Sequence, residues 1–403
     1  MRLWRHEIFP RSRTSAGLIS LLRAASHGRV DLPMAEFDER MIRWIVETGL
    51  GPLLLNASAR DPGAVLSPLW PLVQAANLTA RLITADQMDA MTEIIDACQD
   101  EAPPLVLLKG ISICEQYYPE PHFRPMRDLD FLIESDAVSA IESTLGRLGY
   151  VQPLQRPAPF YATHHHSSPF FHPDTGVWVD VHRALVASTS ELRADEIFST
   201  ENLNAHLRPS AFRGRPVRRL SDELQVVHLS CHWAHRLQVV GGMVAMVDLT
   251  YLLKNAHALQ WARIREWTEH SVASRYLYLL LTYLTTRGLI DLDPAIVHRL
   301  RPTQSSLDHI ALEIGHALID RYVVGGRDFG RLMSERNLQR LWRALILRRL
   351  PRRSPRRMPD VLGSGGGEEA REDTSRAKGG ARTDGSTQCA TRERCAEEER
   401  RGA

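Results

Sequence analysis

The sequence predicts an α+β fold, in which a small mixed sheet with helices is flanked by N- and C-terminal helical regions and followed by a disordered tail. Three observations support this prediction. Apolar residues recur at spacings of three and four over residues 16–99 and 221–349, the period of amphipathic helices. Residues 128–133 and 177–182 alternate apolar and polar instead, as half-buried strands do. Residues 351–403 contain almost no aliphatic side chains and cannot bury enough apolar area to offset the entropy of ordering.

These changes of pattern divide the chain into four parts. Pro103-Pro104 ends the first helical pattern, because proline cannot continue a helix. The second helical part begins at Ser221, an expected N-cap, with Asp222 and Glu223 in the first turn. The predicted parts are a helical N-terminal region (1–102), an α/β domain (103–220), a helical C-terminal domain (221–350) and a disordered tail (351–403).

The composition is that of a globular chain without a dominant charge. Its 403 residues are 43% hydrophobic, and 50 lysines and arginines balance 48 aspartates and glutamates to a formal net charge of +2. No global field therefore favours nucleic acid or an anionic membrane as a partner. The five cysteines lack the short spacing of a zinc knuckle or a redox pair, so we expect a reducing compartment, the cytoplasm.

Neither end of the chain nor its most apolar window suggests a membrane. Residues 1–13 lack the apolar stretch and cleavage site of a secretory signal. The most apolar window, residues 237–253, contains Gln238 and Asp248 and is too short to span a bilayer. A buried helix is the better interpretation, and Asp248 must then be paired, with a histidine or an arginine.

The predicted α/β domain opens with a strand and a helix. Residues 105–108 form a short apolar run typical of a buried strand, and the apolar face of residues 111–118 predicts the helix. Lys109-Gly110 lies at the junction. Glycine lets the backbone approach a phosphate and the helix N-terminus supplies N–H donors, so we predict that both residues bind substrate.

Three aspartates and a histidine share the polar faces of the two predicted strands. Alternation places Asp128 and Asp130 on one face of the first strand, and Asp180 and His182 on one face of the second. Neighbouring carboxylates can hold one or two Mg²⁺ ions, with Mn²⁺ as an alternative, and such sites suit phosphoryl or nucleotidyl transfer. We predict the three aspartates as metal ligands and catalytic residues. His182 is expected to bind substrate or to hold Asp180 in place.

Two arginines lie beside the first pair of aspartates. Arg124 and Arg127 precede Asp128 in a loop and are predicted to bind a triphosphate, although they can equally pair with carboxylates of the protein itself. An isolated Asp-x-Asp is common on solvated strand edges. The ordered series of strand, Lys-Gly, helix, arginine loop and aspartate strands favours a nucleotide-type site instead.

These motifs together resemble a known family. The resemblance is to the uncharacterised nucleotidyltransferase family of the DNA polymerase beta superfamily, over about residues 75–290. The segments that carry it are Leu107-Leu108-Lys109-Gly110, Tyr117-Tyr118-Pro119, Arg124-Pro125, Asp128-Leu129-Asp130-Phe131-Leu132-Ile133, Val179-Asp180-Val181-His182, and a helical segment with His228, His232 and Asp248.

The resemblance implies a function and roles for these residues. It implies a small nucleotidyltransferase sheet, with Asp128, Asp130 and Asp180 as the ligands of two metal ions and Lys109-Gly110 beside the nucleotide phosphates. Asp180 would also activate the acceptor hydroxyl. The expected reaction moves a nucleoside monophosphate from a nucleoside triphosphate, such as ATP, to an unidentified hydroxyl of a small molecule, peptide or protein. Relatives resemble accessory proteins of biosynthetic clusters, so a biosynthetic partner protein is a possible partner.

An alternative function is a catalytically weak binding or scaffold protein with the same fold. The superfamily usually has a Gly-Ser or Gly-Gly pair before the Asp-x-Asp, whereas here Gly110 is followed by Ile111 and then Ser112.

A transferase acting on transfer RNA ends would need a basic groove. A single short cluster of arginines is too little evidence for such a groove, so nucleic acid is not the expected partner. The cluster consists of Arg213, Arg215, Arg218 and Arg219.

Histidines concentrate in two places. The run 164–166, followed by His172, suggests zinc, but three consecutive histidines cannot all face one metal from an extended chain, so we favour a loop over the site. His228, His232 and His235 lie on one helical face without a carboxylate at ligand spacing, so we favour packing over metal binding.

Overall fold

The structure is a computed structural model. It describes residues 13–99, 103–153, 161, 164–187, 190–236, 242–256, 258–302, 309–325 and 335–347. The chain up to Arg349 groups into one compact unit. The predicted disordered tail, residues 351–403, lies outside the described residues, and the division into domains stays a prediction.

A six-stranded mixed sheet confirms the predicted fold class. The strands pair in parallel between β2 and β4 and between β1 and β6, and their other neighbours are antiparallel. The strands expected near residues 105–108, 128–133 and 177–182 are all present. In spatial order the sheet consists of β3 (Phe170–Phe171), β4 (Trp178–His182), β2 (Leu129–Leu132), β1 (Val106–Leu107), β6 (Arg215–Leu220) and β5 (Leu207–Phe212).

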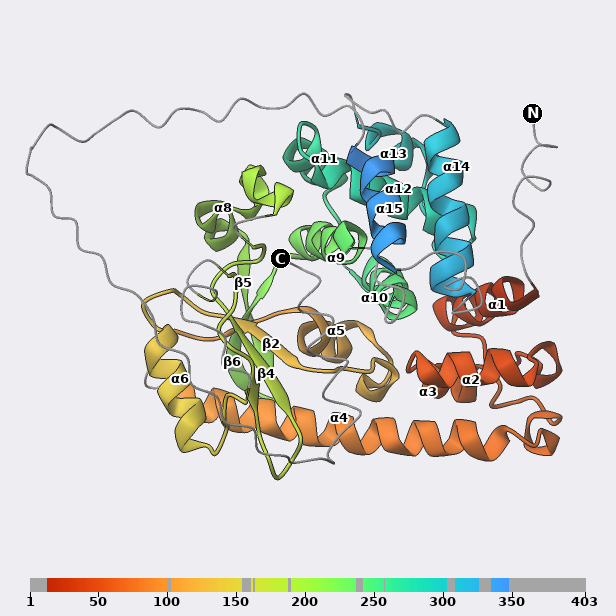
Figure 1. The fold of residues 1–403 in the computed structure, drawn as a ribbon, viewed down its shortest axis with the longest axis horizontal. Helices are drawn as coiled ribbons and strands as arrows, with labels where there is room; N and C mark the ends of the chain where they lie inside the picture. The colour runs from red at the N-terminus through yellow and green to blue at the C-terminus, as the bar shows by residue number, and fades with distance from the viewer. Residues whose placement is uncertain are drawn as a thin grey trace, which may run out of the picture. The chain divides into compact units, whose positions relative to one another are not determined.

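Helices account for the rest of the described elements, as the periodicity predicts (Figure 1). The N-terminal region contains α1 (Arg13–His27), α2 (Glu39–Glu47), α3 (Gly51–Ala57) and α4 (Trp70–Cys98). The α/β part contains α5 (Lys109–Tyr117), α6 (Val138–Arg147) and α8 (Thr200–Ala205). The C-terminal part contains α9 (Asp222–Arg236), α10 (Gly242–Asn255), α11 (Trp261–Thr268), α12 (Ala273–Thr286), α13 (Pro294–Arg299), α14 (His309–Leu318), the π-helix η7 (Ile319–Val324) and α15 (Glu335–Leu347). Short 3₁₀ helices are η2 (Met34–Glu36), η3 (Ala64–Leu66), η4 (Pro121–Phe123), η5 (Glu191–Ala194) and η6 (Glu196–Phe198).

Among the described residues, no helix is both long and apolar enough to cross a membrane.

The ends of the helices test the capping predictions. Ser221 precedes α9 as expected, and its hydroxyl accepts a hydrogen bond from the Leu224 backbone N–H at 3.3 Å. Gly149 follows α6 with a φ of +90°, the left-handed conformation expected at a helix end. Neither Ser135 nor Asp136 caps α6. The helix begins one residue later, at an Ala137 cap that makes no side-chain hydrogen bond.

The β5–β6 hairpin and β3 were not expected from the sequence. Two residues, Arg213 and Gly214, join β5 to β6 with φ values of +47° and +80°. Positive φ at both central residues is what a tight hairpin turn requires, but arginine is an uncommon choice there. Because the usual Asn-Gly or Asp-Gly signal is missing, the pattern of the sequence alone did not reveal the turn.

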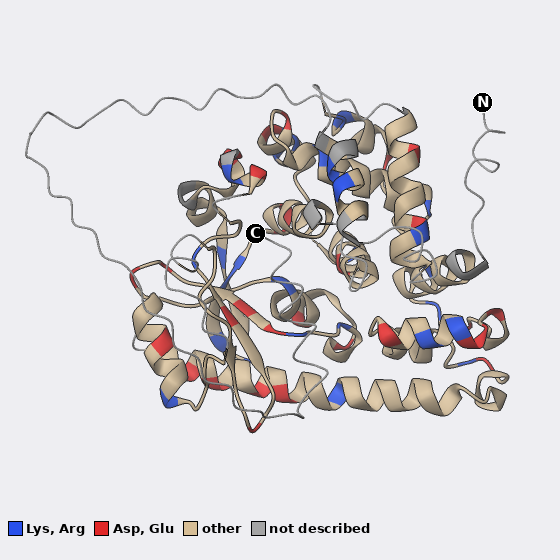
Figure 2. Ribbon diagram, in the orientation of Figure 1, with Lys and Arg blue, Asp and Glu red and all other residues tan. Residues whose placement is uncertain are grey.

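Acidic residues of α4 and α5 pair with the arginines of this hairpin. Figure 2 shows acidic residues on the part of α4 beside the sheet and basic residues on the hairpin strands. Three of the four arginines that an RNA groove would use are therefore bonded to carboxylates of the protein. The pairs are Arg213 with Asp89, Arg215 with Asp96 at 2.6 Å, and Arg219 with Glu115.

One face of the sheet is apolar and packs on α4 and α6. Phe131 and Leu129 of β2 and Val179 of β4 are fully buried, in one hydrophobic cluster with Ile94 of α4 and Ile141 of α6. Because side chains alternate along a strand, burying this face directs the intervening polar residues to the opposite face. The apolar face therefore determines where the aspartates point.

Helices from the two ends of the described chain share a second hydrophobic cluster. Trp44 of α2 donates its indole N–H to the Val324 carbonyl at 3.1 Å. Tyr251 of α10 donates its hydroxyl to the Ala25 carbonyl of α1 at 3.3 Å. These bonds join segments that lie more than 200 residues apart, so α1 and α2 pack against helices of the C-terminal part.

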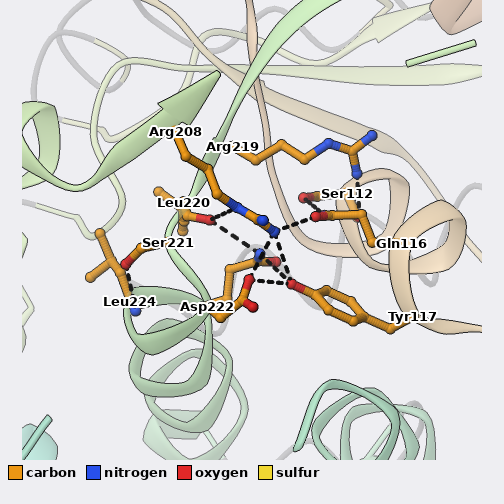
Figure 3. Close-up of polar contacts among 10 residues, drawn as sticks. Ser112, Gln116, Tyr117, Arg208, Arg219, Leu220, Ser221, Asp222 and Leu224 are labelled. Atoms are coloured by element: carbon orange, nitrogen blue, oxygen red, sulfur yellow. Dashed lines mark hydrogen bonds and ion pairs between the residues drawn. The ribbon is translucent and has the colours of Figure 1, made fainter. Parts of the chain in front are cut away.

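A partly buried polar network joins α5, the hairpin and α9 (Figure 3). The Tyr117 hydroxyl donates to Asp222 Oδ1 at 2.6 Å and accepts from Arg208 at 3.1 Å and Gln225 at 3.2 Å. Arg208 also lies 2.8 Å from Asp222. Burial, followed by the hydrogen bond to Asp222, raises the pKa of Tyr117 above its usual range, so the hydroxyl keeps its proton. The network fixes α5 against the first turn of α9.

Asp248 is buried in the apolar helix α10 and is paired with an arginine, as predicted. Arg124 donates to both carboxylate oxygens, at 3.2 and 3.0 Å, and the Tyr118 hydroxyl donates to Oδ1 at 2.6 Å. Burial and the charge of Asp248 raise the pKa of Tyr118 well above its usual range. A bidentate arginine pair of this kind fixes both partners geometrically.

Breaking this buried pair should cost much more stability than breaking a surface pair. We expect Asp248→Asn to lower the free energy of unfolding by about 3 kcal/mol, because a buried guanidinium loses its counter-charge. The matched control is Glu39→Gln in the exposed pair with Arg43, for which we expect about 0–1 kcal/mol. Urea unfolding measures both values. Equal small losses in the two variants would contradict the structural role of Asp248.

Candidate active site

The register of the two central parallel strands brings the predicted site residues together. Asp130 of β2 pairs with Asp180 of β4, and His182 lies two residues further along β4 on the same face. One ligand atom from each of these three residues lies within 4.8 Å of the others. The alternation in the sequence predicted the shared face, and the strand pairing supplies the contact that the sequence could not show.

Asp130 is the centre of this group. Its Oδ1 accepts hydrogen bonds from the Lys109 ammonium at 2.7 Å and from His182 Nε2 at 2.8 Å. The residue is 3% exposed. Burial alone would raise its pKa, but the charge of Lys109 and the hydrogen bond from His182 outweigh burial and hold it well below the usual range. Asp130 is therefore ionised.

The same buried surroundings shift the pKa values of Lys109 and His182 in opposite directions. Burial alone would lower the pKa of Lys109, but the negative charges of Asp130 and Asp128 raise it above the usual value. The pKa of His182 is lowered, by burial first and then by the ammonium of Lys109. The site thus contains a charged lysine and a neutral imidazole that donates its proton to a carboxylate.

Asp128 and Asp180 border this centre. Asp128 immediately precedes β2 and is half-buried, and it does not belong to the group of ligand atoms within 4.8 Å. Burial, followed by the negative charge of Asp130, raises the pKa of Asp128 to about 6. Asp180 is half-buried on β4. The structure therefore places two of the predicted metal ligands, Asp130 and Asp180, side by side. The third, Asp128, lies two residues before Asp130, just outside β2.

The Lys109-Gly110 junction is strained and closely packed. Lys109 has a φ of +44°, in the left-handed region that non-glycine residues rarely adopt, and strain of this kind clusters at functional sites. The Leu108 N–H donates to the Asp130 carbonyl at 3.0 Å, which fixes the end of β1 beside β2. A Cβ atom at Gly110 would lie 2.4 Å from Arg124 Nη1 and 2.9 Å from Met126 Cγ. The close approach that Gly110 permits is thus to the protein's own Arg124.

The remaining predicted substrate residues have different surroundings. Arg124 is bonded to Asp248, whereas Arg127 is exposed and its charge acts on Asp128. Ser112 is buried and its hydroxyl accepts from Gln116 Nε2 at 3.1 Å (Figure 3). Ser112 therefore faces the interior of the protein and does not take the place of the serine in the usual Gly-Ser pair.

Histidines of α9 face the same site. His228 is 2% exposed, and its pKa is lowered to about 3, by burial and then by the charge of Lys109. Its ring centroid lies 6.0 Å from that of His232. The side chain of His235 lies outside the described residues. The buried position of His228 agrees with the packing role that we favoured from the sequence.

We argued against metal binding by residues 164–166 because we expected an extended chain there, and that expectation is wrong. The backbone bends at His164 and His165 instead of running extended, and one ring nitrogen from each of the three histidines lies within 4.8 Å of the others. No pattern in the sequence indicated this bend. His172, in contrast, lies apart from the three, where its ring contacts Tyr150.

The fold and the site together define the class of protein. Aspartates paired across parallel strands, beside a lysine at a strand-to-helix junction, are what the sequence pattern led us to expect of a nucleotidyltransferase. The chain belongs to the family described as uncharacterised nucleotidyltransferase, whose family model matches residues 36–287. No curated protein and no solved structure matches the chain. Membership of this family supports nucleotidyl transfer in general and a nucleoside triphosphate as the substrate.

Gly110 and Gly146 give a matched test of the packing at the junction. We expect Gly110→Ala to lower the free energy of unfolding by about 1–3 kcal/mol, because the added methyl group overlaps Arg124 and Met126. At Gly146, in α6, a Cβ meets nothing within 4 Å. We expect Gly146→Ala to stabilise the protein by up to about 1 kcal/mol, since alanine favours helix. Chemical denaturation compares the two, and an unchanged stability of Gly110→Ala would disprove the close packing.

Proposed function

We propose that this protein transfers a nucleoside monophosphate from a nucleoside triphosphate to a hydroxyl acceptor on a small molecule, a peptide or a protein, with Mg²⁺ or Mn²⁺ as cofactor. The observation that carries the proposal is the pairing of Asp130 with Asp180 on adjacent parallel strands, in a chain whose family is that of nucleotidyltransferases. Lys109 and His182 converge on the same carboxylate.

The donor atoms fit a divalent cation. Asp130 and Asp180 supply carboxylate oxygens, the ligands that Mg²⁺ and Mn²⁺ prefer, and His182 lies within the same 4.8 Å group. Asp128, which lies two residues before Asp130, would complete the set of metal ligands. Such ions neutralise the charge of the triphosphate and favour the departure of pyrophosphate. The ion pair of Asp130 with Lys109 supports the proposal, because this carboxylate already balances one positive charge.

The chemical step requires one proton acceptor. The acceptor oxygen forms a bond to the α-phosphorus, the bond from that phosphorus to the oxygen bridging to the β-phosphate breaks, and pyrophosphate leaves. The hydroxyl proton passes to the carboxylate of Asp180. Asp180 suits this role because it is half-buried, whereas Oδ1 of Asp130 already accepts two hydrogen bonds.

Lys109 and His182 have separate roles in this proposal. The Lys109 ammonium balances Asp130 and would turn to the phosphates when a cation binds the aspartates, a change that its flexible four-carbon side chain allows. His182 is a positioning residue, because its Nε2–H fixes the orientation of Asp130. Arg127, exposed beside Asp128, contacts the triphosphate, whereas Arg124 is bonded to Asp248 and fixes the packing of the junction at Gly110.

A binding or scaffold function is the second candidate, and one observation favours it. Ser112 is turned into the protein, and Gly110 packs on Arg124, so the glycine loop offers no serine hydroxyl to phosphate in this arrangement. A protein of this kind would bind a nucleotide, ATP for example, and a biosynthetic partner protein without turnover. Turnover of any nucleoside triphosphate that depends on the aspartates would exclude it.

Replacing Asp130 should abolish transfer without unfolding the protein. We expect Asp130→Asn to reduce pyrophosphate release at least about a hundredfold, since metal ions contribute several kcal/mol to stabilising the transition state. The assay would offer ATP, GTP, CTP and UTP with Mg²⁺ or Mn²⁺ and a panel of hydroxyl acceptors. A chelator should abolish the wild-type activity.

The matched control is Asp174→Asn, which removes an exposed carboxylate in the turn before β4. This variant should keep wild-type activity, and circular dichroism should show the same fold in all three proteins. Undiminished pyrophosphate release by Asp130→Asn would contradict the proposed enzyme. Tight nucleotide binding without release by the wild type would support the scaffold function instead.

A further inference from the structure

Three consecutive histidines converge beside the candidate active site. The ring centroids of His164, His165 and His166 lie 4.2 to 4.7 Å apart. One ring nitrogen of each lies within 4.8 Å of the others. Consecutive side chains on an extended strand point to opposite faces, so this convergence depends on the bent backbone.

Hydrogen bonds to β4 hold this bend in place. The Ser167 N–H donates to the Val181 carbonyl at 2.9 Å, and the Arg183 N–H donates to the His165 carbonyl at 2.9 Å. His166 forms an isolated antiparallel bridge with His182. The three imidazoles are therefore presented by backbone that is anchored to the sheet, which reduces the entropic cost of binding a ligand.

Two of the three rings present a nitrogen that a cation can bind. His166 Nδ1 lies 2.7 Å from the Ser167 carbonyl, which can only accept, so Nδ1 carries the proton and Nε2 has the lone pair. A ring that donates its second N–H to a carbonyl is the usual state of a metal-binding histidine. His165 Nδ1 is buried and has no hydrogen-bond partner among the described residues. A buried polar atom without a partner is costly, and a cation would satisfy it.

We propose that His164, His165 and His166 bind one divalent transition-metal cation, Zn²⁺ or a close relative. Three imidazole nitrogens suit Zn²⁺ and leave a fourth position for water or another ligand. Mg²⁺ prefers oxygen ligands, so this site differs in chemistry from the aspartates. His182 links the two sites, since its ring lies 5.3 and 5.4 Å from those of His165 and His166 and it donates to Asp130. The proposal does not depend on nucleotidyl transfer.

Zinc titration of the full chain tests this site. The protein is purified without a histidine tag, stripped with a chelator and titrated with Zn²⁺ by calorimetry in excess Mg²⁺, which occupies the aspartates. We expect one Zn²⁺ per chain. His165→Ala and His166→Ala should each weaken binding at least about tenfold, because each removes one of three ligands. Co²⁺ in place of Zn²⁺ should give the visible absorption of a nitrogen-ligated ion, and either variant should lose it.

Two controls separate this site from the alternatives. His298→Ala removes an exposed histidine of α13 and should bind Zn²⁺ like the wild type. Asp130→Asn should also keep the zinc, because it changes none of the three proposed ligands. His165→Ala removes no hydrogen bond that the described residues show for that ring nitrogen, so it should fold, which circular dichroism would verify. Zinc binding that survives both histidine variants, or that Asp130→Asn abolishes, would overturn the proposal, as would a wild type that binds none.

Discussion

Asp130 Oδ1 accepts hydrogen bonds from a largely buried ammonium and a buried imidazole, and this one atom joins β2 to the start of α5 and to β4. An ionised carboxylate that is 3% exposed would cost several kcal/mol if its charge were not balanced. Lys109 provides that balance from the junction of β1 and α5, and the neutral His182 adds a hydrogen bond from β4. The strained φ of Lys109 is the local cost of bringing the ammonium to this position.

The rest of the fold holds these three side chains in place. The apolar face of the sheet packs on α4 and α6, which turns the aspartates to the opposite face. The pair of Arg124 with Asp248 joins the loop before β2 to α10, and Gly110 leaves room for the guanidinium. The network around Tyr117 fixes α5 against α9. Together these contacts connect the α/β part to α4 before it in the sequence and to α9 and α10 after it, so the site requires the surrounding helices as well as the strands.

Local pattern was enough to predict the central strands and the face on which the aspartates lie. The alternation of residues 128–133 and 177–182 and the short apolar run 105–108 correspond to β2, β4 and β1. The requirement that a buried charge be paired correctly predicted a partner for Asp248. These successes share a cause, because periodicity and charge burial are properties of a single segment or a single residue.

What the sequence did not reveal depends on long-range contacts or unusual backbone. The Arg213-Gly214 turn uses arginine at positive φ, so the hairpin lacked its usual signal. Lys109 was expected at a phosphate, and its pairing with Asp130 depends on the register of β1 against β2. The convergence of residues 164–166 follows from their bridge to β4, since an extended chain would separate the rings. No local pattern contains these tertiary constraints.

The central claim is that Asp130 and Asp180 share a divalent cation together with a nucleoside triphosphate. Electron paramagnetic resonance of Mn²⁺, titrated into the protein with a nonhydrolysable nucleoside triphosphate, measures this most directly. The account predicts that Mn²⁺ binds in the presence of the nucleotide, and that Asp180→Asn weakens this binding at least about tenfold, because one of the two paired carboxylates loses its charge. Equal Mn²⁺ binding by the wild type and Asp180→Asn would contradict it.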